Sequence, residues 1–150
     1  MFLDSSPSKE RLFLLLGATS GFLGVALGSF GAHALRESLT DDLLGIFETG
    51  VRYQMYHAFA LIAAGLVTTR RRGRAAPAAG WLFAFGTIVF SGSLYTLALT
   101  GVRGWGAVTP FGGVMWLLAW ALLAAAATRP RVFVADAEEE IAVLSASGDE

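Results

Sequence analysis

Two histidines and the polar residues near them are the part of this 150-residue chain that could do chemistry. His33 and His57 are its only histidines, and each lies beside an apolar run. Such a pair could bind a metal ion or hold a haem. However, a metal site usually needs three or four ligands, and the chain offers no cysteine and no acidic residue in its apolar runs. We therefore expect no metal, no cofactor and no catalytic residue.

The segment "RYQMYHAFAL", residues 52–61, places polar side chains at the start of an apolar stretch. If it enters a membrane from the outer face, these side chains lie near the outer interface, level with the outer ends of the other runs. The candidate cluster, for binding or for structure, is then His33, Arg52, Gln54, His57, Tyr95 and Thr109.

An unpaired imidazole inside a membrane is costly, so ionisable groups there usually face the bundle interior. We therefore expect His57 to point inward and to find a partner among His33, Tyr95 and Thr109. A helical spacing of four residues also predicts an ion pair between Glu48 and Arg52.

The elements that would position this cluster are long uncharged runs. Residues 12–32, 75–102 and 104–128 contain 21, 28 and 25 residues without a charge, and crossing a bilayer takes about 20. The first run exceeds the apolar core of a signal peptide, so we expect it to be retained. A fourth run, 53–69, is shorter but sufficient if its first turn lies among the headgroups. The fold class predicted is an all-α integral membrane protein, a four-helix bundle with spans at about 12–32, 53–69, 77–100 and 107–127.

The connection between the first two spans has the pattern of a helix lying in the membrane surface. Over about residues 36–50, apolar residues recur at helical spacing and charged residues occupy the other faces. Ser38 or Thr40 is expected to cap its main turn. The sequence thus predicts a separate amphipathic interfacial helix.

Positive charge indicates the orientation. In a four-span chain, eight Lys and Arg residues lie on the side that holds both termini, and three lie on the other side. Cytoplasmic segments carry the excess, so both termini and the loop "RRRGR", residues 70–74, are predicted to be cytoplasmic. We expect a multi-pass protein of the bacterial inner membrane with a cytoplasmic segment 1–11, a membrane domain 12–128 and an acidic tail 129–150. The tail is expected to be mobile or loosely helical.

Glycines in the first span form a stripe along one helical face, with spacings of 4, 3, 4 and 3: Gly17, Gly21, Gly24, Gly28 and Gly31. Small residues let helix backbones approach closely in a membrane. This favours a helix-packing seam over a glycine-lined pore. The small face of the third span, with Ala84, Thr87 and Ser91, is its expected partner.

Four blocks of the sequence carry a family resemblance. They are "GSFGAHAL" at 28–35, "FETGVRYQMYHAFAL" at 47–61, "FSGSLYTLALTG" at 90–101 and "TPFGGVMWLLAW" at 109–120. In this order they resemble the YgdD-like small inner-membrane proteins, domain-of-unknown-function family 423, which includes transmembrane protein 256 of eukaryotes. The resemblance covers roughly residues 12–127, and Gly50 stands where the family usually has alanine. It implies a small four-span membrane protein and no established activity.

These observations favour a structural or accessory component of a membrane complex or homo-oligomer, with the polar cluster as a clamp between helices. Its partners would be the lipid bilayer and other membrane chains, not nucleic acid. The alternative is a binder or carrier of a small molecule, an ion or a lipid headgroup that uses the same cluster. An enzyme with a metal or haem at the two histidines is a third possibility, and we expect the protein not to be an enzyme.

Overall fold

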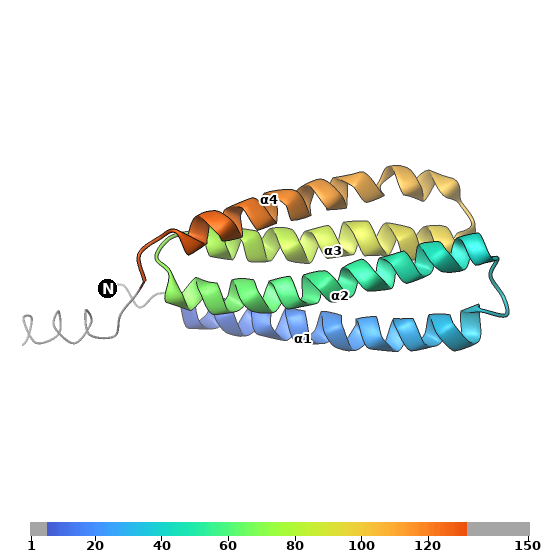
Figure 1. Cartoon of the computed structure of the whole chain (residues 1–150), viewed down its shortest axis with the longest axis horizontal. Helices are drawn as coiled ribbons and strands as arrows, with labels where there is room; N and C mark the ends of the chain where they lie inside the picture. The colour runs from blue at the N-terminus through green and yellow to red at the C-terminus, as the bar shows by residue number, and fades with distance from the viewer. Residues whose placement is uncertain (1–5, 132–150) are drawn as a thin grey trace, which may run out of the picture.

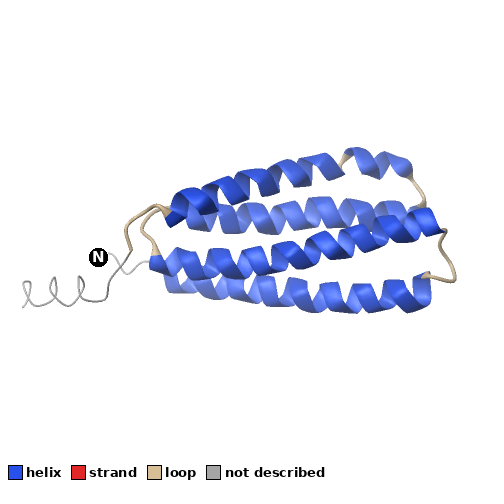
Figure 2. Ribbon diagram, viewed as in Figure 1, coloured by secondary structure: helices blue, strands red, loops and turns tan. Residues whose placement is uncertain are grey.

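A computed structural model describes residues 6–131 of the chain. Within them lie four long helices: α1 (Ser6–Phe30), α2 (Asp41–Arg70), α3 (Ala75–Thr100) and α4 (Thr109–Ala127). Figure 1 shows them side by side, and Figure 2 shows no strand among the described residues. The predicted all-helical fold is thereby confirmed. The expectation for the acidic tail concerns residues 132–150, which lie outside the described residues.

The helices run up and down, and each packs mainly against the next one in the chain. The described chain begins and ends at the end of the bundle that holds the α2–α3 connection (Figure 1). Contact between α1 and α3, and between α2 and α4, is much more limited. The packing therefore zigzags, with α1 and α3 both packed on α2.

Three helical stretches among the described residues are long and apolar enough to cross a membrane: Lys9–Leu35, Ala75–Thr100 and Arg103–Ala127. They correspond to the first, third and fourth predicted spans. The first continues from α1 through a turn of π-helix, Gly31–Leu35. The last begins with a short 3-10 helix, Arg103–Ala107, ahead of α4. The helix that contains the second predicted span is α2, and it is not among the three.

The prediction of a separate interfacial helix at 36–50 was wrong. Residues 41–50 form the first turns of α2, which continues without interruption to Arg70. Gly50, which like Gly45 is a candidate breaker before Tyr53, costs a helix only about 1 kcal/mol relative to alanine. There a Cβ would come within 2.8 Å of the Tyr95 ring, so the glycine serves close packing on α3 rather than a helix end.

The start of α2 was predicted more accurately. Thr40 caps the helix, with its side chain accepting a hydrogen bond from the Leu43 N–H at 3.4 Å. Asp41 and Asp42 follow in the first turn, where negative charge is favourable. Ser38 instead donates to the Ala34 and Leu35 carbonyls.

The glycine stripe of α1 faces α2, so the expected partner, the third span, was wrong. A Cβ at Gly17 would lie 2.6 Å from Ile62 Cγ1 and 2.9 Å from the Ala58 carbonyl oxygen. Further along, Gly31 lies against the ring of Phe47. Because only five residues, 36–40, separate the helical turns of α1 from α2, the two helices form an antiparallel hairpin whose backbones approach closely.

A second glycine seam joins α3 to α4. A Cβ at Gly112 would lie 2.6 Å from the Phe90 backbone nitrogen and 2.9 Å from the Gly86 carbonyl oxygen. At Gly86 the neighbour is the indole of Trp116. These two helices are thus in backbone contact where the Trp116 side chain enters the core.

Candidate functional site

Gln54 of α2 joins three helices through its side-chain amide. Its nitrogen donates to the Ser20 carbonyl of α1 at 2.8 Å, and its oxygen accepts from the Tyr95 hydroxyl of α3 at 2.8 Å. Gln54 is buried. Both polar ends of this amide are therefore satisfied by neighbouring helices, which is what buried polar groups require.

A second bond lies beside it. The buried Ser91 hydroxyl of α3 donates to the Gly50 carbonyl of α2 at 2.9 Å. Gly50 comes four residues before Gln54 on α2, and Ser91 comes four residues before Tyr95 on α3. Residues four apart lie on one helix face, and a Cβ at Gly50 would lie 2.8 Å from the Tyr95 ring, so both bonds belong to one contact between α2 and α3.

This polar layer lies deeper than predicted. Gln54 is 13 residues from the start of α2 at Asp41, about 20 Å along the helix at 1.5 Å per residue. Its α1 partner, Ser20, is likewise near the middle of its helix. The layer crosses the middle of the bundle, whereas the prediction placed it near the outer interface because it began the second span at Tyr53.

His57 lies on another side of α2, against α4. Its ring stacks on the indole of Trp116, with centroids 3.5 Å apart and planes 5° apart. Its Nδ1 lies 2.8 Å from the carbonyl oxygen of Tyr53 on its own helix, a distance at which the ring N–H can donate. The expected partner from His33, Tyr95 or Thr109 was wrong, since neither contact involves them. Its inward orientation agrees with the prediction: His57 is 6% exposed.

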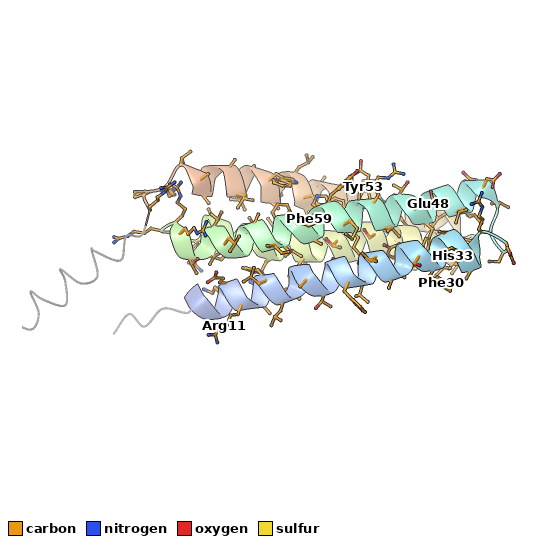
Figure 3. All side chains as sticks on the ribbon, turned by 60° about the horizontal axis from the view of Figure 1, so that its bottom comes forward. Arg11, Phe30, His33, Glu48, Tyr53 and Phe59 are labelled. Carbon is orange, nitrogen blue, oxygen red and sulfur yellow. The ribbon has the colours of Figure 1, made fainter. Side chains whose placement is uncertain are left out.

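The other predicted members of the cluster lie elsewhere. His33 is exposed near the end of the bundle opposite Arg11 (Figure 3). Arg52 is also exposed, and the predicted Glu48–Arg52 ion pair does not form among the described residues. Thr109 shares a 2.7 Å hydrogen bond with the Ser93 hydroxyl at the α3–α4 contact.

The six candidate residues therefore do not form one site. Gln54 and Tyr95 belong to a bridge between α1, α2 and α3, and His57 belongs to an aromatic stack between α2 and α4. Tyr53 joins the same stack, with its ring centroid 5.9 Å from that of Trp116. Polar residues on different faces of a helix contact different neighbouring helices, and this separates the six candidates.

A groove of about 410 Å³ opens between α1 and α3 beside the Gln54 bridge. Its walls are mainly apolar side chains of those two helices, and Gln54 and Leu61 of α2 form its floor. Ser20 also lines it, and the Ser20 hydroxyl oxygen is buried without a hydrogen-bond partner among residues 6–131. The groove could hold an elongated apolar group with one polar atom.

The contacts that Ser20, Ser91 and Trp116 make in the structure were not predicted from the sequence. Ser91 was read as part of a packing face, and its hydroxyl bridges to α2 instead. Trp116 and Trp120 share a face of α4, yet only Trp116 is buried. The signal for Trp116 was available in Gly86 and Gly112, since small residues on paired helices make room for a large ring. Within residues 6–131 no group of three or more His, Asp or Glu side chains converges as a metal site would require.

Comparison with known proteins gives consistent matches. The family model described as "Protein of unknown function (DUF423)" matches residues 27–113. "UPF0382 membrane protein" of Staphylococcus epidermidis is 44% identical over 113 residues, covering 75% of this chain and 92% of the relative. YwdK of Bacillus subtilis, also named a UPF0382 membrane protein, is 40% identical over 120 residues, which are 79% of this chain and 98% of the relative.

"UPF0382 inner membrane protein YgdD" of Escherichia coli K12 is 42% identical over 120 residues, or 80% of this chain and 92% of the relative. No solved structure matches. The resemblance found in the four sequence blocks is therefore confirmed. The chain is a membrane protein and belongs to the family of unknown function DUF423.

Proposed function

We propose that this protein is a non-enzymatic structural or accessory component of an inner-membrane assembly, formed with other chains or with copies of itself. In this proposal all four helices span the membrane. The polar residues buried among them act as an internal clamp and take no part in transport.

The Gln54 bridge is the observation that carries the proposal. The Gln54 side chain donates a hydrogen bond to α1 and accepts one from α3, so both of its polar atoms have partners within the folded bundle. A carrier needs polar groups that exchange between protein and cargo, whereas these form interhelical bonds of the kind that hold membrane bundles together. His57 likewise has its ring stacked and its Nδ1 bonded within the bundle.

The packing of α2 supports four spans. This helix lies between α1 and α3 and packs on both, so it must share their environment over most of its 30 residues. Its exposed apolar residues, such as Phe59, would face lipid. The proposed orientation, with both termini cytoplasmic, rests on the arginines at the α2–α3 end and follows the positive-inside rule.

Native mass spectrometry after mild detergent extraction tests this function. We expect the wild-type chain to carry a second polypeptide or a second copy. The variant Gln54→Leu/Tyr95→Phe should be less stable but should keep that partner in its folded fraction. A wild-type monomer that carries only a small molecule, lost in this variant, would contradict the structural role. The exposed change Leu117→Ala on α4 serves as a control for detergent effects.

A second candidate function is the binding of a lipid-like molecule, and the groove favours it. Its volume of about 410 Å³ falls in the range of small-molecule sites, about 300–1,000 Å³. The unpaired Ser20 hydroxyl would supply one hydrogen bond. Under this function, Leu23→Trp in the groove wall should remove a bound small molecule, whereas Leu117→Trp outside the groove should not.

A further inference from the structure

Six arginines converge at one end of the bundle from two separate parts of the chain: Arg70, Arg71, Arg72, Arg74, Arg129 and Arg131. We call them the arginine cluster. An isolated antiparallel bridge pairs Arg71 with Arg131. The Arg71 guanidinium also donates to the Arg129 carbonyl at 2.6 Å, and the Arg72 N–H donates to the Pro130 carbonyl at 3.4 Å. Backbone pairing therefore holds the α2–α3 connection beside the chain that leaves α4.

This arrangement concentrates like charge. Glu10 is the one acidic residue that residues 6–131 contribute at this end. Within those residues, five members of the cluster form no ion pair with a carboxylate: Arg70, Arg71, Arg74, Arg129 and Arg131. Guanidinium groups held close together repel one another unless anions lie between them. The cluster therefore favours an anionic partner, and planar guanidinium groups form bidentate pairs with carboxylates as they do with phosphates.

The chain itself supplies such a partner immediately after Arg131. Residues 132–150 contain six carboxylate side chains and no lysine or arginine. Asp136 is five residues from Arg131, so at full extension it reaches no further than about 18 Å from it. Attachment through so short a link gives an effective concentration on the order of millimolar. The same region lies beyond residue 113, where the match to the family model ends.

We propose that the acidic segment 136–140, "DAEEE", docks on the arginine cluster and neutralises it within the same molecule. Phosphate groups of the surrounding lipids share the required charge. The tail is favoured over them because it starts at the cluster and carries several carboxylates in five residues. This inference does not depend on how the bundle is oriented in the membrane.

Distance measurement between two spin labels tests the docking directly, because the chain has no native cysteine. Labels at Ala75→Cys, at the start of α3, and Ala137→Cys, in the tail, would be compared in nanodiscs of neutral phosphatidylcholine. We expect one narrow distance distribution at low salt. At about 1 M salt, where the screening length falls to about 3 Å, we expect a broad one.

Two charge variants and a control complete the test. Neutralising the tail (Glu138→Gln/Glu139→Gln/Glu140→Gln) or the cluster (Arg70→Gln/Arg74→Gln) should each broaden the distribution at low salt. The control Arg36→Gln/Arg52→Gln, which changes two exposed arginines outside the cluster, should leave it narrow. A broad wild-type distribution that does not respond to salt would overturn the proposal and leave the cluster to lipid phosphates. A distribution that stays narrow in the cluster variant would overturn it as well.

Discussion

At the residue scale, the buried polar side chains of residues 6–131 are partnered by neighbouring helices or by their own backbone, with the Ser20 hydroxyl as the exception. Gln54 and Tyr95 share one hydrogen bond, and Ser91 reaches the Gly50 carbonyl. A hydrogen bond between membrane helices contributes on average about 0.6 kcal/mol and at most about 1.7 kcal/mol. Each contact is thus modest, and the layer matters because several such bonds lie at one level of the bundle.

The Gln54–Tyr95 bond can be measured with a double-mutant cycle. Gln54→Leu and Tyr95→Phe each remove it, so their effects on the free energy of unfolding should be non-additive by about 0.6–1.7 kcal/mol. Unfolding in mixed detergent micelles supplies the free energies. Thr96→Val is the matched control, because the Thr96 hydroxyl bonds to Gly92 of its own helix and should add independently to Gln54→Leu. Additivity of the first pair would mean that the bond contributes nothing.

Substitutions of His57 test whether its stacked ring or its hydrogen-bonded nitrogen contributes more to stability. Phenylalanine keeps a ring against Trp116 and loses only the bond with the Tyr53 carbonyl, so His57→Phe should change stability by less than about 1 kcal/mol. His57→Ala removes the stack and leaves a cavity, which should cost about 2–4 kcal/mol. Thermal unfolding in detergent distinguishes the two variants. Equal losses would show that the imidazole nitrogen, rather than the stack, holds this side of α2.

At the element scale, small residues determine where helices approach. The α1 stripe packs on α2, and Gly86 with Gly112 brings α3 against α4. Both pairs are sequential antiparallel helices with short connections. Neighbours in sequence are thus also the closest neighbours in space.

Two glycines of the α1 stripe should respond in opposite ways to an added methyl group. At Gly17 a Cβ meets the Ala58 carbonyl oxygen at 2.9 Å, so Gly17→Ala must separate the backbones and should cost about 1–3 kcal/mol. At Gly21 the nearest atom is the Ala58 Cβ at 3.9 Å, so Gly21→Ala should be neutral or stabilise by up to about 1 kcal/mol. The fraction folded during detergent titration measures both. If the two alanines have the same effect, this seam is not the close contact described.

Much of the element order could be predicted from the sequence, whereas the pairing of side chains could not. Uncharged runs located α1, α3 and α4 because helix length in a bilayer is fixed by its thickness. The continuity of α2 through residues 41–52 was missed because their charged side chains resemble a surface helix when they are read without their neighbours. Contacts such as Gln54 with Ser20 depend on helix rotation, and residue spacing alone does not determine how one helix turns toward another.

At the scale of the whole molecule, large apolar side chains cover the outside of the bundle, and several polar side chains are buried within its mainly apolar interior. Phe22, Ile88 and Leu117 are each at least 68% exposed, whereas Gln54 and His57 are each 6% exposed. This is the distribution expected for a protein whose solvent along the bundle is lipid. Most charged groups lie toward the two ends, with the arginine cluster at one and the exposed Arg103–Asp42 pair, 2.9 Å apart, at the other, and exposed Arg52 on α2 is an exception.

The central claim is that α2 crosses the membrane, since Gln54 and His57 act as a clamp inside the bilayer only if it does. Single cysteines in this cysteine-free chain test it: Gly45→Cys lies in the first turns of α2, Arg74→Cys lies just after its end, and Gly104→Cys lies between α3 and α4. A membrane-impermeant thiol reagent applied to intact spheroplasts should label positions 45 and 104 at once. Position 74 should react only after the membrane is permeabilised. If positions 45 and 74 are labelled from the same side, α2 does not cross, and the four-span account is wrong.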